Sequence, residues 1–215
     1  QSECRFLLLS PNNLLKPSDG GPVAVPSQDM VLGIYYLTQE RPGDKGEGMF
    51  FKSPNEAILA YENDAVTLHA RIKVRVTKTM ADGTVKTDIV ETTVGRILFN
   101  EIIPQDLGFV DRTIPENELK FEIDFLVKKK QLKQILEKVI NTHGAMQTAI
   151  TLDDIKAIGY KYSTRAAMTV SISDMTVPAS KKQLLADAES TVDLIAKNFR
   201  RGLITEEERY KEVID

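Results

Sequence analysis

The sequence predicts an α+β fold: a mixed module with a small antiparallel β subdomain and surrounding helices, followed by a truncated antiparallel helical hairpin. Residues 67–77 alternate apolar and polar side chains, which is the period of a half-buried strand. Residues 129–141 and 181–201 instead place an apolar residue every three or four positions, which is the period of a helix. Strands gathered in the middle of a chain with helices on both sides are typical of the α+β class.

Two helices are predicted before the strands. Asp29–Thr38 suits a helix, and Ser27 is a possible N-cap because its hydroxyl can accept from a free backbone N–H. Asn55–Asn63 suits another, with Ser53 as the cap and Pro54 at the first helical position, where a missing N–H costs nothing.

The β subdomain is predicted over about 67–99. One face of its first strand is apolar, and the other is polar with His69, Arg71, Lys73 and Arg75. Ala81–Thr84 contains Asp-Gly and predicts a hairpin turn. A returning strand over Val85–Thr92 and a further extended segment over Gly95–Phe99 are expected to follow.

The helices after the strands have recognisable ends. His143–Gly144 is expected to end the helix that begins at Lys129. Thr151–Ala167 predicts the next helix, with Thr151 as its N-cap. Gly159 lies inside it at a cost of ~1 kcal/mol relative to alanine, which indicates close packing at that position.

The last segment has the pattern of a helical hairpin. Ser180–Gln183 resembles a capping box and opens a helix that Gly202 ends. Thr205 and Glu208 form a second capping box, and the helix after it reaches Asp215 without a terminating signal. We therefore expect a hairpin that is cut short, and two domains covering 1–177 and 178–215.

Composition narrows the function classes. Lys+Arg total 28 against 31 Asp+Glu, so no global basic field favours nucleic acid. No apolar run approaches the ~20 residues that span a bilayer, so no membrane partner is expected. A single cysteine, Cys4, fits a reducing cytoplasm and is interpreted as a small buried or interfacial residue.

Ser27, Gln28 and Asp29 are the most interesting polar cluster. They could simply begin a helix, with Ser27 or Asp29 as its cap. The alternative is that Gln28 faces a ligand while a neighbour caps the helix.

The basic strand face could likewise be an ordinary solvated surface or a phosphate-binding stripe, and Lys128–Lys130 are interpreted as solvated charge. With two histidines and one cysteine, a zinc site is not expected.

Five ordered blocks of this sequence resemble the beta-prime subunit of bacterial DNA-directed RNA polymerase. The most specific are Leu9–Pro17 with Val25–Thr38, which contains Pro-Ser-Gln-Asp, and Leu152–Pro178. The others are Lys45–Met49, Glu91–Asn100 and Gly202–Asp215. Together they extend along nearly the whole chain.

The resemblance implies a fragment of a nucleotidyltransferase that transcribes DNA into RNA. It would line the secondary channel, through which nucleotides enter and backtracked RNA leaves, with Ser27, Gln28 and Asp29 as channel-lining candidates. The family's magnesium-binding motif Asn-Ala-Asp-Phe-Asp-Gly-Asp is not in this sequence, so magnesium and zinc are implied only for other parts of the parent, and the fragment alone should be inactive.

The implied partners are the beta, alpha, omega and sigma subunits, the DNA template and RNA, and channel-binding factors of the Gre type. Lys211 and Glu212 differ from the family version that binds guanosine tetraphosphate, so alarmone binding is not implied. The alternative reading is a stand-alone protein-interaction module that acts through the C-terminal helical hairpin.

Overall fold

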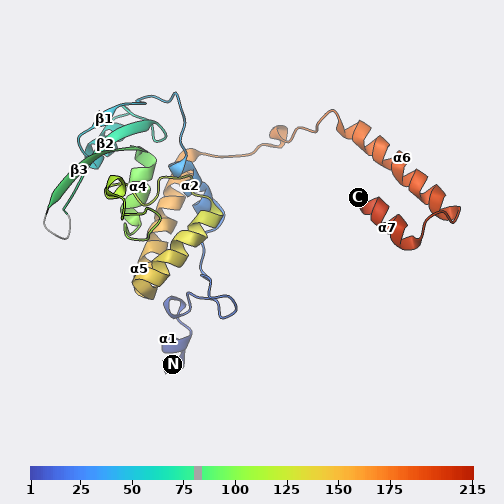
Figure 1. The fold of residues 1–215 in the computed structure, drawn as a ribbon, viewed down its shortest axis with the longest axis horizontal. Coiled ribbons are helices and arrows are strands. Elements are labelled where there is room, and N and C mark those ends of the chain that lie inside the picture. The colour runs from blue at the N-terminus through green and yellow to red at the C-terminus, as the bar shows by residue number, and fades with distance from the viewer. Residues whose placement is uncertain (80–83) are drawn as a thin grey trace. The chain divides into compact units, whose positions relative to one another are not determined.

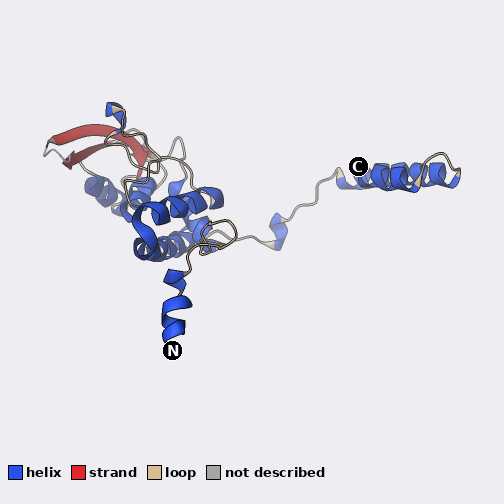
Figure 2. Ribbon diagram, turned by 60° about the horizontal axis from the view of Figure 1, so that its bottom comes forward, coloured by secondary structure: helices blue, strands red, loops and turns tan. Residues whose placement is uncertain are grey.

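The computed structural model describes residues 1–79 and 84–215 and divides into two compact units, Gln1–Met168 and Thr169–Asp215. Within these residues it contains seven α-helices and one three-stranded sheet (Figures 1 and 2), which confirms the α+β class. The first unit contains the sheet and the hydrophobic core. The second unit contains a helical hairpin.

The first unit contains five α-helices: α1 (Ser2–Leu7), α2 (Asp29–Thr38), α3 (Pro54–Glu62), α4 (Val94–Ile102) and α5 (Lys129–Ala166). The bounds predicted for α2 are confirmed, and α3 begins at Pro54 as expected. The Ser53 hydroxyl accepts a hydrogen bond from the Glu56 backbone N–H at 3.2 Å, so the predicted cap of α3 is confirmed too.

The sheet has the strand order β1 (Phe50–Phe51), β2 (Arg71–Thr79) and β3 (Val85–Thr93). β2 and β3 form the predicted antiparallel hairpin, in register from Arg71 opposite Thr93 to Thr79 opposite Val85. β1 runs parallel to β2, so the sheet is mixed and not purely antiparallel. Ala81, Asp82 and Gly83 of the predicted turn lie outside the described residues.

The extended segment predicted over Gly95–Phe99 is wrong, because these residues belong to α4. The hydroxyl of Thr93, the last residue of β3, accepts from the Arg96 backbone N–H at 3.2 Å and caps the helix directly after the strand. Six of the nine residues of α4 are buried, and the short apolar run Ile97–Phe99 cannot be assigned to a helix or a strand from its composition alone.

Two glycines let α2 and α5 approach each other through bare backbone. A Cβ atom at Gly33 would lie 1.8 Å from the Gly159 carbonyl oxygen, and one at Gly159 would lie 2.8 Å from the Met30 oxygen. The close packing predicted at Gly159 is therefore confirmed. This crossing forms one side of the core, in which Ile34, Leu37 and Ile155 are fully buried.

α5 is broken at Gly144, whose φ of 76° and ψ of −175° are not helical, so the predicted end of the first helix there is confirmed. The N-cap predicted at Thr151 is wrong. The helix resumes directly after the glycine, and Thr151 lies inside it, fully buried. Only Gly144 departs from helical geometry at the break, and the Thr148 hydroxyl donates to its carbonyl at 2.7 Å.

The second unit contains α6 (Lys181–Arg200) and α7 (Glu206–Ile214). The capping box at Thr205 and Glu208 is confirmed, since the Thr205 N–H donates to the Glu208 carboxylate at 2.8 Å. Ser180 makes no side-chain cap bond because its backbone is already helical, so that capping box is wrong. The apolar stripe of α6 is largely exposed, with Leu184 at 65% and Leu185 at 54%.

His69 was predicted on the polar face of a strand, and that prediction is wrong. β2 begins only at Arg71, and His69 is 3% exposed. Its ring packs edge-on against Tyr36, with centroids 4.5 Å apart, and Nδ1 lies 3.1 Å from the Gln39 carbonyl oxygen. Burial lowers the pKa of His69, and the contact with Gln39 opposes that shift.

We expect the first unit to lose stability as the pH falls from 7.5 to 5.5. Because the folded-state pKa of His69 lies below its unfolded value of about 6.5, the unfolded chain binds the proton more tightly in this range. Denaturant unfolding should show a lower unfolding free energy at pH 5.5 than at pH 7.5 in the wild type, and a clearly smaller difference in His69→Gln. Equal pH dependence in the two proteins would contradict the assignment to His69.

Candidate functional site

Ser27, Gln28 and Asp29 are all exposed at the start of α2. The N-cap residue is Gln28 and not Ser27, and no side chain caps the helix, so that predicted cap is wrong. Gln28 has φ 48° and ψ −120°, a conformation that non-glycine residues rarely adopt. Among the described residues, these three side chains form no hydrogen bond and are free for another partner.

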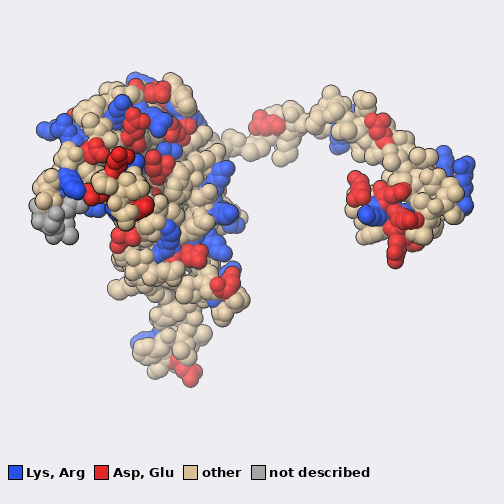
Figure 3. Space-filling view, viewed as in Figure 1, with Lys and Arg blue, Asp and Glu red and all other residues tan. Residues whose placement is uncertain are grey.

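Gln28 lies on the rim of a hollow of about 330 Å³ between the starts of α2 and α5. Val31, Leu32 and Tyr35 of α2 form its largely apolar floor, and α5 contributes Lys128 and Lys129. Both lysines are exposed, as predicted. Figure 3 shows Lys and Arg side chains gathered along the side of the first unit where α5 begins. Sequence reasoning missed this pairing because no local pattern connects Gln28 with residues so distant along the chain.

The arrangement suits an anion that also carries a flat or apolar part. Two ammonium groups supply six N–H donors and positive charge, and the Gln28 amide both donates and accepts. The floor of Val31, Leu32 and Tyr35 can cover an apolar or aromatic surface. Phosphate groups joined to a planar base have this combination of properties.

Part of the basic strand face is paired with acidic neighbours. Arg71 lies 3.5 Å from Glu40 and 3.6 Å from Glu91, and Lys73 lies 3.4 Å from Glu91. Arg75 instead lies over the Phe50 ring, with its guanidinium 5.7 Å from the ring centre. The ordinary reading of this face as a solvated surface therefore fits the structure better than a phosphate-binding stripe.

The remaining chemical candidates are accounted for by local contacts. His143 Nε2 lies 2.7 Å from the Asp106 carboxylate, and Asp153 accepts from Lys156 at 2.6 Å. Cys4 is exposed, so of the two alternatives given for it, buried or interfacial, the buried one is wrong and the interfacial one stays a prediction. Over residues 1–79 and 84–215, no three His, Cys, Asp or Glu side chains cluster as a metal site requires, and no helix is long and apolar enough to span a bilayer.

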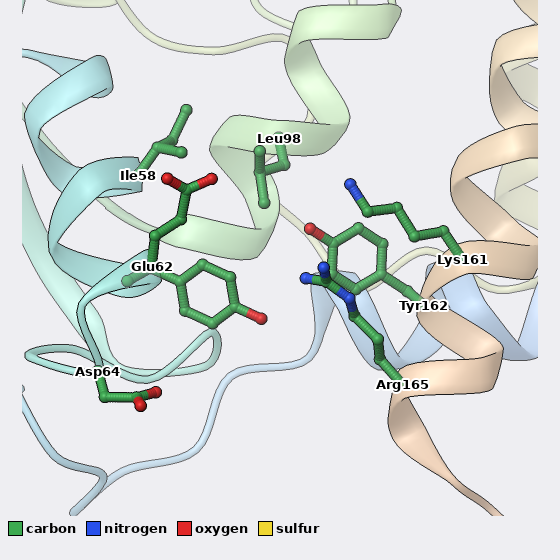
Figure 4. Close-up of a pocket in the computed structure, with 8 residues that line it drawn as sticks. Ile58, Glu62, Asp64, Leu98, Lys161, Tyr162 and Arg165 are labelled. Atoms are coloured by element: carbon green, nitrogen blue, oxygen red, sulfur yellow. The ribbon is translucent and has the colours of Figure 1, made fainter.

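A second hollow, of about 320 Å³, lies between α3, α4 and α5 and was not predicted (Figure 4). Glu62 and Asp64 lie on one side of it and Lys161 and Arg165 on the other. Within the described part of the chain none of these four side chains forms an ion pair.

Tyr162 lies between the two cations of this hollow. Burial raises the pKa of Tyr162. The guanidinium of Arg165 lies 5.6 Å from the centre of the ring. Arg165 thus packs on the aromatic ring, whereas the Asp174 carboxylate, farther along the chain, accepts from the Ser171 backbone N–H at 2.8 Å.

Comparison with known proteins identifies the relatives of this chain. Residues 13–175 match the family model described as RNA polymerase Rpb1, domain 3. Over all 215 residues the chain is 72% identical to DNA-directed RNA polymerase subunit beta' of Lachnoclostridium phytofermentans and 56% identical to that of Clostridium novyi. It is 58% identical over 214 residues to the same subunit of Caldicellulosiruptor saccharolyticus. The chain spans only 17 to 18% of the length of these relatives.

Proposed function

Because the chain belongs to the RNA polymerase Rpb1 domain 3 family, we propose that it forms part of the wall of the polymerase's secondary channel. In this proposal the hollow at the start of α2 faces the channel. Gln28, Lys128 and Lys129 contact the phosphates of an incoming ribonucleoside triphosphate or of a backtracked RNA end. The observation that carries the proposal is the meeting of an exposed, unpartnered amide with two lysines over an apolar floor.

The charge of the ligand explains why the site uses these residues. A triphosphate carries several negative charges, and exposed ammonium groups at the mouth of a channel raise its local concentration. Contacts of this kind are individually modest, because water and salt screen them. Such a surface can guide a nucleotide inward and still release it, which suits a passage better than a tight binding site.

The chemistry of nucleotide addition belongs to other parts of the proposed parent. This sequence contains no Asn-Ala-Asp-Phe-Asp-Gly-Asp motif, so no residue of the chain is assigned a catalytic role and the chain alone should not polymerise RNA. We propose that its partners are the other polymerase subunits, with the DNA template and RNA in the assembled enzyme. The exposed apolar stripe of α6 then offers a surface for a channel-binding factor of the Gre type.

The test is a polymerase reconstituted with Gln28→Ala or with Lys128→Ala/Lys129→Ala. Loss of one charge-assisted contact should raise the KM for nucleotide by about 3- to 10-fold, and the double lysine variant should respond more strongly to salt. Cleavage of backtracked RNA should slow as well. The rate of RNA elongation is measured at saturating and at limiting nucleotide. A defect seen only at limiting nucleotide indicates slower nucleotide entry, whereas a defect at both concentrations indicates slower nucleotide addition.

Lys52→Ala is the matched control, because Lys52 is also an exposed lysine of the first unit but does not line the hollow. It should behave as wild type. Normal assembly combined with unchanged KM and unchanged cleavage in both test variants would reduce the start of α2 to a structural element and refute the proposal.

A further inference from the structure

The hollow between α3, α4 and α5 carries charges of both signs that have no partner in this chain. Glu62 and Asp64 lie on its α3 side, and Lys161 and Arg165 project toward it from α5 (Figure 4). All four residues are exposed, and over residues 1–79 and 84–215 none of their side chains forms an ion pair. Both walls of the hollow are therefore available to a ligand.

Tyr162 adds a hydroxyl group to the basic wall. The residue is only 3% exposed, but it lines the hollow, and its ring extends from α5 between the side chains of Lys161 and Arg165 (Figure 4). In the part of the chain that the structure describes, the Tyr162 hydroxyl has no hydrogen-bond partner. Because the hydroxyls of buried tyrosines usually find a partner, this one is a free donor aimed at the place of a ligand.

The acidic wall is held in place by hydrogen bonds at the end of α3. Lys45 Nζ donates to the Asp64 carbonyl at 2.6 Å, and the Asp64 N–H donates to the Tyr61 carbonyl at 3.0 Å. Asp64 completes this turn with a φ of 55°. The C-terminal end of a helix carries a partial negative charge, which adds to the charge of the two carboxylates. This wall therefore favours a cationic group.

The two walls together select a dipolar ligand. The basic wall supplies the N–H donors of a guanidinium and an ammonium group and one phenolic O–H, which suit a carboxylate. A phosphate would bring a second negative charge toward Glu62 and Asp64, and the repulsion disfavours it. We infer that the hollow binds a ligand that has a carboxylate at one end and a cationic group at the other, and that is about as large as one basic amino acid.

The rest of the lining suits the chain that joins the two charged ends. Ile58 of α3 and Leu98 of α4 are partly buried apolar residues of the hollow. Its volume of about 320 Å³ is at the lower end of the range for small-molecule sites, so it has room for one residue. The ligand is either a free amino-acid derivative or a basic residue at the carboxyl end of a peptide. The site lies at the opposite end of α5 from Lys128 and Lys129 and does not depend on the proposed channel function.

An NMR titration of the isotopically labelled 215-residue chain with Nα-acetyl-L-arginine tests the inference. The backbone amide signals of residues 161–165 should shift with a Kd on the order of 1 mM at low salt, as expected for a ligand of about 15 non-hydrogen atoms. Nα-acetyl-L-argininamide lacks the carboxylate and N-acetyl-L-norvaline lacks the guanidinium, so each should bind about 3- to 10-fold more weakly. The acetylated peptide Ala-Ala-Arg should match Nα-acetyl-L-arginine if the natural ligand is a peptide end, and should bind more weakly if it is a free derivative.

Tyr162→Phe separates binding from folding. It removes an oxygen atom that has no partner within the described chain, so the Tm should stay within about 2 °C of wild type, whereas the Kd should rise about 3- to 10-fold. Arg165→Gln should raise the Kd by a similar factor, and Glu62→Gln/Asp64→Asn should remove the preference for Nα-acetyl-L-arginine over N-acetyl-L-norvaline.

Lys52→Gln is the matched control, because Lys52 is exposed but does not line the hollow, and it should leave the Kd unchanged. The inference is overturned if Nα-acetyl-L-arginine leaves the amide signals unshifted or if the argininamide binds equally well. It is also overturned if Tyr162→Phe and Arg165→Gln both keep the wild-type Kd.

Discussion

Gly33→Ala is expected to destabilise the first unit by about 3 kcal/mol or more, a large share of the 5–15 kcal/mol that holds a typical domain together. The new methyl group would lie 1.8 Å from the Gly159 carbonyl oxygen and 2.8 Å from the Ser163 backbone nitrogen. Both neighbours are backbone atoms of α5, so no side chain can turn aside. Relief requires that α2 and α5 separate, which opens the core around Ile34 and Leu37.

Urea unfolding followed by circular dichroism measures the loss, and Gly21→Ala is the matched control. A methyl group at Gly21 would lie no closer than 3.4 Å to the Asp19 side chain, which is ordinary contact, so this variant should stay within about 0.5 kcal/mol of wild type. A Gly33→Ala protein as stable as the control would show that the two helices do not meet through their backbones.

Arg112→Ala is expected to cost about 3 kcal/mol, because it leaves the buried carboxylate of Glu122 without its charge partner. The Glu122 side chain is 0% exposed, and Arg112 Nη2 lies 3.0 Å from it. Arg112 also donates to the backbone carbonyls of Gln105 and Glu118, so it joins three parts of the connection between α4 and α5. The remaining N–H donors to Glu122, from Phe109 and Val110, are neutral and do not replace a guanidinium.

Glu116→Ala is the control, because it removes a charged side chain from the same segment between α4 and α5 without touching Glu122. Glu116 is exposed, and its removal should change the unfolding free energy by less than about 0.5 kcal/mol. Arg112→Lys should recover only part of the loss, since an ammonium cannot reach the carboxylate and both carbonyls in the same geometry. A loss below about 1 kcal/mol for Arg112→Ala would mean that water solvates Glu122.

Several features that depend on neighbouring residues were predictable, although the side-chain caps expected at Ser180 and at Ser27 or Asp29 are not found. Four features that a few adjacent residues predict are found in the structure. They are the cap at Ser53 with Pro54, the Thr205–Glu208 capping box, the alternating β2–β3 hairpin and the break at Gly144. Gly159 is a further case, since a glycine inside a strong helix pattern indicates a close approach even before the partner is known.

Features set by burial were not predictable. α4 contains the short apolar run Ile97–Phe99, which fits a strand as well as a helix, and His69 follows an alternating pattern but lies buried before the strand begins. Thr151 has the chemistry of a cap, but the helix already starts after Gly144. The candidate site divides in the same way: Gln28 was accessible to local reasoning, whereas its meeting with Lys128 and Lys129 is a product of the tertiary fold.

The glycine crossing of α2 and α5 has a consequence for how such chains can diversify. Where two helices meet through backbone atoms, those atoms set the distance between the helix axes. No side chain lies at such a contact, so a substitution cannot shorten one to bring the helices closer. The exposed side chains beside the crossing, such as Gln28 and Lys128, can instead be replaced without changing the distance between the two helices. The crossing therefore fixes the backbone frame and leaves the surface chemistry beside it open to substitution.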